Sequence, residues 1–326
     1  IGNNGEQSRE SFFTYVQHRM SGFSGKSQRP RPIDLLSHPG YMEMLAQTIA
    51  RSRVDLMGAP QATGEVRYTG HDAVKKECDD FRRALDAQKS RFVDTFVTAP
   101  SPGIIAAAML NAHYPSIREY VAALGEALSV EYQTIVNSGF ALQIDAPDLA
   151  MEHHTSFADK PLSEFLDFID VVIAAINRAI AGLPKDKIRL HVCWGNYEGP
   201  HTHDIALDAI AEHLYRAEVS ALMLSMANPR HEHEYRVLER RPLPAGMGLI
   251  VGAIDSTTNY VEHPEVVADR IERAARAVGD PRRIMAGTDC GFDTSAGFGT
   301  VADELVWEKL RALADGAAIA TRRLFG

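Results

Sequence analysis

The sequence has few cysteines, few basic residues relative to acidic ones, and no long apolar segment. Three cysteines, an odd number, argue against a framework of disulfide bonds. No apolar run approaches the ~18 residues of a membrane-spanning helix, which excludes a membrane partner. The net charge of −9 argues against a nucleic-acid-binding protein, which would carry a basic face. The first thirty residues are polar and lack the apolar core of a secretion signal, so we expect a soluble, cytoplasmic protein.

Hydrophobic residues, in contrast, are plentiful. They make up 45% of the 326 residues, which is enough for a large core and too much for a disordered chain. From Arg91 onward, short apolar segments alternate with amphipathic helical patterns, and this alternation predicts parallel strands joined by crossover helices. The predicted strands are 91–98, 140–145, 188–193, 219–225, 248–255 and 283–290.

Three of the intervening helices are predicted clearly. In 163–181 the apolar side chains recur with the 3.6-residue period of a helix that buries one stripe. We interpret Ser163 as the N-cap of this helix and Gly182 as part of its stop signal. The segments 264–279 and 304–325 repeat the pattern.

The predicted strands mostly end in a polar or reactive residue, namely Asp145, Cys193, Ser225, Asp255 and Cys290. Such residues at successive strand ends are typical of the top face of a (β/α)8 TIM barrel. An open doubly wound sheet also binds ligands at its strand ends, but no Gly-x-Gly-x-x-Gly loop follows a strand here. We therefore predict one α/β domain, a closed (β/α)8 barrel over residues 1–326. The stretch at about 22–80 is either an excursion over the barrel mouth or a mobile loop.

Six strands are too few for an eight-stranded barrel. The chain opens with Ile-Gly-Asn-Asn-Gly-Glu at 1–6, which is typical of the exit loop of a strand. We therefore expect the native chain to be longer, and the given sequence to lack one whole strand and most of another.

One strand end carries a pattern suited to metal binding. Side chains alternate along a strand, so His191 and Cys193 point to the same side, with Cα atoms ~6.6 Å apart. Cys290, at the end of the last predicted strand, is the candidate third ligand. Three protein ligands with a vacant fourth position are typical of catalytic zinc. Cys78, in a charged helical stretch, is interpreted as a bystander on a surface helix.

Three further histidine pairs follow predicted strand ends: 153 and 154, 201 and 203, and 231 and 233. Polar residues at such places usually cap helices or face solvent, so we favour that interpretation over metal binding. A metallohydrolase of the His-x-His type would need its pair near the first strand. That alternative stays open because we expect the given sequence to lack the first strand, where such a pair would lie.

These motifs resemble the catalytic domain of cobalamin-independent methionine synthase, and more closely its smaller single-barrel relatives, which include epoxyalkane:coenzyme M transferase. The resemblance spans nearly all of the chain. It is carried by 4–6 (Asn-Gly-Glu), 99–103 (Ala-Pro-Ser-Pro-Gly), 143–148 (Gln-Ile-Asp-Ala-Pro-Asp), 191–196 (His-Val-Cys-Trp-Gly-Asn), 228–234 (Asn-Pro-Arg-His-Glu-His-Glu), 252–255 (Gly-Ala-Ile-Asp) and 287–291 (Gly-Thr-Asp-Cys-Gly).

The resemblance implies a barrel with Zn²⁺ at its mouth, held by His191, Cys193 and Cys290. Zinc of this kind favours the deprotonated form of a substrate thiol, which is the nucleophile in methyl or alkyl transfer. Catalytic positions fall on Asp255 and Thr257. The positions matched to substrate contacts are Glu6, Ser101, Asp145, Trp194, Asn196 and Asn228. Of these, Glu6 and Asp145 match the acidic residues that hold an ammonium group.

The sequence also departs from the methionine synthases. Ser225 stands where they carry a glutamate as an additional zinc ligand, so water or a substrate thiol is expected in the fourth position. Thr257 replaces a histidine, and threonine cannot deliver a proton as an imidazolium does. No tryptophan around 103–108 corresponds to the one that stacks on folate. These departures argue against methyltetrahydrofolate as the methyl donor.

We therefore predict a zinc-dependent thiol methyl- or alkyltransferase that acts on a small-molecule thiol and an alkyl or methyl donor. One alternative is thiol addition to an epoxide, as in epoxyalkane:coenzyme M transferase. The sulfonate of coenzyme M would require a basic residue in the site, and Arg230 is a candidate. The competing interpretation is that Arg230 forms an ion pair with Glu232 or Glu234. A zinc-binding homologue without catalysis is the third reading.

Overall fold

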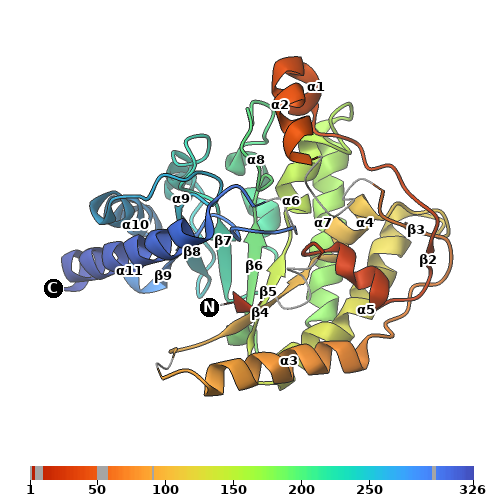
Figure 1. Ribbon diagram of the computed structural model, residues 1–326, viewed down its shortest axis with the longest axis horizontal. Helices are drawn as coiled ribbons and strands as arrows, with labels where there is room; N and C mark the ends of the chain where they lie inside the picture. Colours follow the sequence, from red (N-terminus) through yellow and green to blue (C-terminus); the bar gives the residue numbers. More distant parts are fainter. Residues whose placement is uncertain (1, 4–9, 50–57, 90–91, 296–298) are drawn as a thin grey trace.

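Seven parallel strands form the central sheet of the protein (Figure 1). The computed structural model describes residues 2–3, 10–49, 58–89, 92–295 and 299–326. The strands pair side by side in the order β1-β4-β5-β6-β7-β8-β9, and each pairing is parallel. They are β1 Gly2–Asn3, β4 Phe96–Pro100, β5 Ala141–Asp145, β6 Ile188–Val192, β7 Ala221–Leu224, β8 Gly248–Ile254 and β9 Ile284–Thr288.

The six strands predicted from residue 91 onward are confirmed as β4 to β9. Their ends shift by a few residues, and β4 begins at Phe96, while residue 91 lies outside the described part of the chain. The seventh strand, β1, lies in the opening segment that was interpreted as a strand exit. Among the described residues, no ladder joins β9 to β1. The parallel α/β sheet is thus confirmed, whereas its closure into a barrel stays a prediction.

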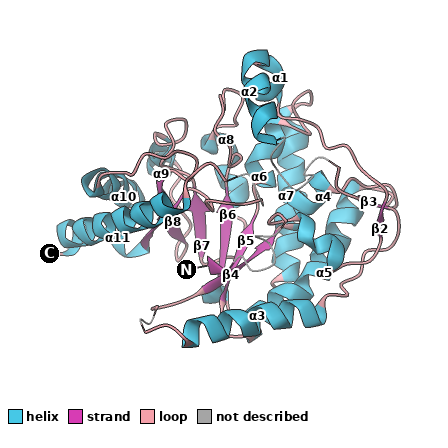
Figure 2. Cartoon of the chain, viewed as in Figure 1, coloured by secondary structure: helices cyan, strands magenta, loops and turns pink. Residues whose placement is uncertain are grey.

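Helices connect the strands and lie around the sheet. Figure 1 shows α4, α5 and α7 to the right of the strands, and α9, α10 and α11 to the left. Figure 2 shows how strands and helices alternate along this arrangement. The helices are α1 Ile33–Ser37, α2 Pro39–Ile49, α3 His71–Asp86, α4 Pro102–Ala108, α5 Ile117–Asn137, α6 Asp148–Met151, α7 Leu162–Ala179, α8 Leu207–Leu214, α9 Val237–Arg240, α10 Pro264–Val278 and α11 Asp303–Phe325. No helix in the described ranges combines the length and apolarity that crossing a membrane requires.

The three predicted helices are confirmed as α7, α10 and α11, with one correction. The predicted N-cap of α7, Ser163, lies inside the helix, because α7 begins at Leu162 after Pro161. Proline fits this position because its ring fixes φ near −65° and the chain is still extended there, with φ −58° and ψ 143° at Pro161. The apolar stripe was therefore a more reliable guide than the capping residue.

The segment at about 22–80 packs against the rest of the protein through several elements. A short antiparallel pair joins β2 Phe23–Ser24 to β3 Gln61–Ala62. Asp34 of α1 is buried and accepts hydrogen bonds from Thr202 in the loop after β6. Cys78 lies on the inner stripe of the amphipathic helix α3 and is 1% exposed, so its thiol is buried although the outer face of the helix is charged. Its interpretation as a bystander stays a prediction.

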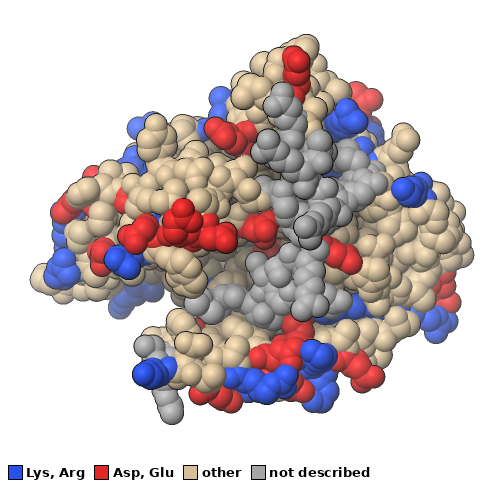
Figure 3. Space-filling model, viewed as in Figure 1, with Lys and Arg blue, Asp and Glu red and all other residues tan. Residues whose placement is uncertain are grey.

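The outer face of α3 is charged and mixed in sign. Lys75 pairs with Asp79, and Lys76 pairs with Asp80, each one helical turn apart. Figure 3 shows blue and red side chains side by side along the lower edge, where α3 lies. On this face of the described chain, basic side chains are interspersed with acidic ones.

Candidate functional site

Three side chains from distant parts of the sequence meet at the carboxyl ends of β6 and β9. His191 is on β6, Cys193 follows the end of β6, and Cys290 follows the end of β9. Their donor atoms all lie within 4.8 Å of one another, with 3.6 Å between Cys290 Sγ and His191 Nε2. All three are buried. The structure thus brings together the three residues that the sequence singled out as candidate zinc ligands.

The meeting of β6 and β9 requires a strongly curved sheet. These strands are separated by β7 and β8, which makes three strand-to-strand steps. In a flat sheet with ~4.8 Å between strands, they would lie ~14 Å apart. The short contact between Cys290 and His191 is possible only because the sheet curves between them.

The three side chains share protons in a way that suits metal binding. Burial opposes a charge on His191, but hydrogen bonds with Asp145 and Cys193 outweigh it and raise its pKa to about 10. A hydrogen bond from the Cys290 thiol, together with His191, lowers the pKa of Cys193. The same bond raises the pKa of Cys290. These opposite shifts favour negative charge on Cys193 over Cys290, and a dication bound between the three side chains could take the place of the shared protons.

The orientation of His191 is fixed from behind by a carboxylate. Its Nδ1 lies 3.1 Å from Oδ1 of Asp145, the residue opposite it on β5. Gln143 donates to the same oxygen at 2.8 Å. A histidine that gives Nδ1–H to a carboxylate can turn Nε2 toward a metal ion, which is the usual arrangement behind a metal-bound histidine. Here Nε2 lies 3.0 Å from the carbonyl of Asp289 and 3.6 Å from Sγ of Cys290. The predicted contact between Asp145 and a substrate ammonium group stays a prediction.

Asp289 organises the loop after β7 by accepting hydrogen bonds from it. Its carboxylate accepts from the backbone amides of Met226, Ala227 and Asn228, at 2.8 to 2.9 Å. The side chain of Asn228, a predicted substrate contact, also donates to it. Burial raises the pKa of Asp289 to about 7, in opposition to these amides.

Ser225, the residue in place of the family glutamate, lies at the edge of the three-residue cluster. Its Oγ is 3.9 Å from Cys290 Sγ and donates to the carbonyl of Asp289 at 3.1 Å. Ser225 is buried. The position therefore borders the cluster, but its side chain is short and already hydrogen-bonded.

Two further predicted residues lie on the loops around this cluster. Asn196 donates to the carbonyl of Gly291 at 2.7 Å and accepts from Ser256 at 2.9 Å, so it links three loops. Asp255 accepts from both the amide and the hydroxyl of Thr257. The two predicted catalytic positions thus contact each other.

Two other predicted substrate-contact residues, Ser101 and Trp194, are buried. Ser101 is fully buried, caps α4 and donates to Asp148. Trp194 is 2% exposed, and its indole nitrogen donates to the carbonyl of Ile205. Glu6 lies outside the described residues.

The histidines after the strand ends form a second cluster that the sequence analysis did not predict. At its centre is Asp204, which that analysis did not single out. Its carboxylate forms hydrogen bonds with His201 and His231 and lies 3.1 Å from a ring nitrogen of His154. The only sequence signal was the three-residue spacing of His201 and Asp204. Arg230 was interpreted either as a sulfonate partner or as an ion-pair partner of Glu232 or Glu234, and neither ion pair is present among the described residues. Arg230 donates to the Thr202 carbonyl, while Arg270 pairs with Glu232 and His231 with Glu234.

Comparison with known proteins supports the resemblance seen in the motifs. No protein-family model matches the chain. The 2-hydroxypropyl-CoM lyase of Xanthobacter autotrophicus is 25% identical over 287 residues, which is 80% of this chain and 69% of the lyase. A methionine synthase of Methanothermobacter thermautotrophicus is 28% identical over 212 residues, which is 64% of this chain and 59% of that protein.

A solved structure shows that the fold is shared as well. A B12-independent methionine synthase from Shewanella, solved in complex with selenomethionine, superposes with a TM-score of 0.70 at 21% identity. The match covers 99% of this chain and 82% of that one. The predicted resemblance is confirmed: in sequence the chain is related to a 2-hydroxypropyl-CoM lyase and to methionine synthases, and in fold to a B12-independent methionine synthase.

Proposed function

We propose that this protein is a zinc-dependent enzyme that transfers a methyl or alkyl group to a thiol, or catalyses the reverse reaction. The observation that carries the proposal is the convergence of His191, Cys193 and Cys290 at the ends of β6 and β9. One imidazole and two thiolates are ligands that Zn²⁺ prefers, and three protein ligands leave a position for substrate. The relatives, a lyase that acts on a CoM thioether and methionine synthases, support chemistry at sulfur.

The charges of the ligands suit thiol activation. A neutral His191 and two thiolates balance a dication, so an added substrate thiolate leaves the site with one net negative charge. A bound zinc ion would supply the Lewis acidity that keeps a substrate thiol, with an ordinary pKa of ~8.5, in its thiolate form. The thiolate then forms a carbon–sulfur bond while the bond between that carbon and its donor breaks.

The chain's own residues prepare the site for this step. Asp145 holds the Nδ1–H of His191, so that Nε2 faces the cluster. Asp289 pins the loop that carries Ser225, and Asn196 ties the loop of Cys193 to that of Cys290. Positioning of this kind keeps the ligand atoms close before any metal binds, which lowers the cost of ordering them.

The proposal includes the architecture. We infer that the sheet closes into a (β/α)8 barrel and that residues 1–326 form one such domain. The strong curvature that brings the ends of β6 and β9 together supports this inference. Segment 22–80, through Asp34 and the loop after β6, would then cover part of the barrel mouth.

Addition of a thiol to an epoxide is the second candidate reaction. The match to the 2-hydroxypropyl-CoM lyase covers 80% of this chain and favours it. It is also consistent with Thr257 in place of a histidine and Ser225 in place of a glutamate.

Metal analysis and thiol assays test the proposal together. We call the cluster of His191, Cys193 and Cys290 the sulfur site. We expect about one zinc ion per chain there, lost in Cys193→Ser and in Cys290→Ser. Cys78→Ala is the matched control, because Cys78 is buried in α3 and contacts neither residue. The protein, incubated with homocysteine or coenzyme M and either methyl donors or short epoxides, should consume thiol only when these cysteines are intact. Full activity in a Cys193→Ser variant would disprove the mechanism, and zinc binding without any turnover would favour a binding protein.

A further inference from the structure

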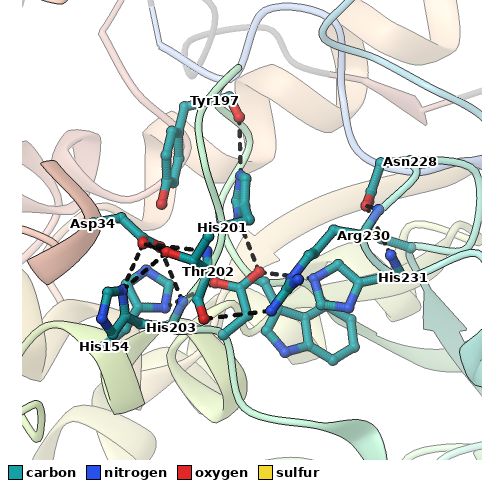
Figure 4. A network of polar contacts seen from close by, with 12 residues as sticks. Asp34, His154, Tyr197, His201, Thr202, His203, Asn228, Arg230 and His231 are labelled. Carbon is teal, nitrogen blue, oxygen red and sulfur yellow. Dashed lines mark hydrogen bonds and ion pairs between the residues drawn. The ribbon is translucent and has the colours of Figure 1, made fainter. Parts of the chain in front are cut away.

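The histidine cluster after β6 and β7 centres on one buried carboxylate. Asp204 Oδ2 lies 2.8 Å from Nδ1 of His201 and 2.7 Å from Nε2 of His231. His201 and Asp204 are in the loop after β6, whereas His231 is in the loop after β7. Figure 4 shows this network, with His201 and His231 turned toward the same carboxylate. The three donor atoms lie within 4.8 Å of one another.

The outer nitrogens of both histidines are already occupied. Nε2 of His201 donates to the carbonyl of Tyr197 at 3.0 Å, and Nδ1 of His231 donates to Glu234 at 3.1 Å. Neutral imidazoles fixed in this way turn their lone pairs toward the oxygen of Asp204. Two lone pairs facing a carboxylate repel it, so either two extra protons or one cation must lie between them. A carbonyl or carboxylate behind each ring is the arrangement usually found behind metal-bound histidines.

A third histidine faces the other oxygen of the same carboxylate without bonding it. The side chain of His154 is 0% exposed, and its Nδ1 is 3.1 Å from Oδ1 of Asp204. The two atoms are not aligned for a hydrogen bond, and neither ring nitrogen of His154 has a hydrogen-bond partner in the described part of the chain. Buried polar atoms rarely lack a hydrogen-bond partner, so a ligand shared by His154 and Asp204 would satisfy both.

Two features of the loop support a ligand here. Among the described residues, His201 is the one non-glycine residue with a positive φ, at 51°, and such strain is found mostly at functional sites. Aromatic rings also back both histidines: Trp194 stacks on His231 at 4.0 Å, and Tyr197 stacks on His201 at 4.3 Å. These rings hold the imidazoles in the orientation that presents their inner nitrogens.

We propose that Asp204, His201 and His231, with His154 as a fourth donor, form a second site for a divalent transition-metal ion, distinct from the sulfur site. Nitrogen and carboxylate ligands suit Zn²⁺ and similar ions, and four protein ligands, whose side chains are at most 13% exposed, would make a closed, structural site. The ligand atoms around one tetrahedral zinc ion lie about 3.3 Å apart. Binding would therefore lengthen the contacts of Asp204 with His201 and His231 by about 0.5 Å. The ion would hold the loop after β6, which begins with Cys193, against the loop after β7.

Cobalt titration can test this site without interference from the sulfur site. The full chain with Cys193→Ala and Cys290→Ala lacks both thiolates, is freed of metal by dialysis against a chelator, and is titrated with Co²⁺. We expect it to bind one ion per chain with visible d–d absorption and without a sulfur-to-cobalt charge-transfer band. The wild-type chain should bind a second ion, with that band.

Further substitutions in this background assign the ligands. Asp204→Asn and His231→Gln should each abolish cobalt binding. His203→Gln is the control, because His203 also contacts a carboxylate, Asp34, but lies outside the cluster. The proposal is overturned if the thiolate-free chain binds no cobalt, or if binding survives both Asp204→Asn and His231→Gln. Far-UV circular dichroism checks that each variant is folded. If either variant unfolds, the number of Co²⁺ ions bound by the thiolate-free chain decides whether the second site exists.

Discussion

Nδ1 of His191 and Oδ1 of Asp145 lie 3.1 Å apart across the β5–β6 ladder, in which the two residues are direct partners. The register of the sheet therefore places a carboxylate behind His191, the one nitrogen donor of the proposed sulfur site. This contact assigns Asp145 a role in orienting His191, in addition to the ammonium contact expected from the resemblance.

Replacement of Asp145 separates these two roles. We expect Asp145→Asn to weaken zinc binding about 10- to 100-fold, because the amide cannot stabilise the Nδ1–H of His191 as a carboxylate does. Competition with a chromophoric chelator measures the affinity. Asp186→Asn, at an exposed carboxylate, should leave it unchanged. If Asp145→Asn retains wild-type zinc affinity and only raises the KM for an amino thiol, the ammonium contact is its main role.

Asn196 should hold the two ligand-bearing loops together. In Asn196→Asp the donor to the Gly291 carbonyl is lost and a negative oxygen faces that carbonyl, while the acceptor for Ser256 remains. The loss of an exposed hydrogen bond of this kind costs ~1 kcal/mol, so we expect about fivefold lower thiol alkylation. Hydrogen exchange at residues 289–291 should become faster. Ser256→Ala removes the other bond alone and should leave exchange in this segment slow, and equal effects of both variants would contradict the role of the Gly291 contact.

The sheet and the sulfur cluster could be predicted because both depend on local patterns. Apolar runs marked β4 to β9, and the two-residue alternation on β6 put His191 and Cys193 on one side. Cys290 followed from the rule that parallel strands present their carboxyl ends at the same edge. None of these inferences needed the exact path of a loop.

The second cluster could not be predicted because it depends on loop conformation. Asp204 and His231 are 27 residues apart and meet only because the loops after β6 and β7 fold toward each other. Neither loop has a periodic pattern, and a positive φ at His201 has no signature in the sequence. The failed N-cap at Ser163 has a similar cause, since either Pro161 or Ser163 suits a helix start and tertiary packing selects one.

The stability of the protein should fall with rising pH because of Asp148. Burial raises the pKa of this carboxyl to about 7, and its Oδ2 has no hydrogen-bond partner among the described residues. A folded-state pKa above the unfolded value of ~3.9 means that the stabilisation is complete below pH ~4 and is lost as the pH rises through 7. Asp148→Asn should remove the contribution of this carboxyl to the slope, which amounts to about 4 kcal/mol. Urea unfolding at several pH values measures it. Parallel curves for both proteins would show that Asp148 does not titrate in this range.

Ser225 tests whether the open position of the sulfur site matters for function. Its Oγ lies 3.9 Å from Cys290 Sγ, so the longer side chain in Ser225→Glu can bring a carboxylate to a bound zinc ion. We expect tighter zinc binding, because the glutamate adds a fourth ligand and a third negative charge, and slower thiol alkylation, because the thiol must now displace a carboxylate. Chelator competition and single-turnover thiol loss measure the two effects. Ser225→Gln has the same length without the charge, so it should crowd the site yet leave zinc affinity near that of the wild type. If both variants bind zinc like the wild type and react equally slowly, crowding alone explains the loss and position 225 does not border the metal.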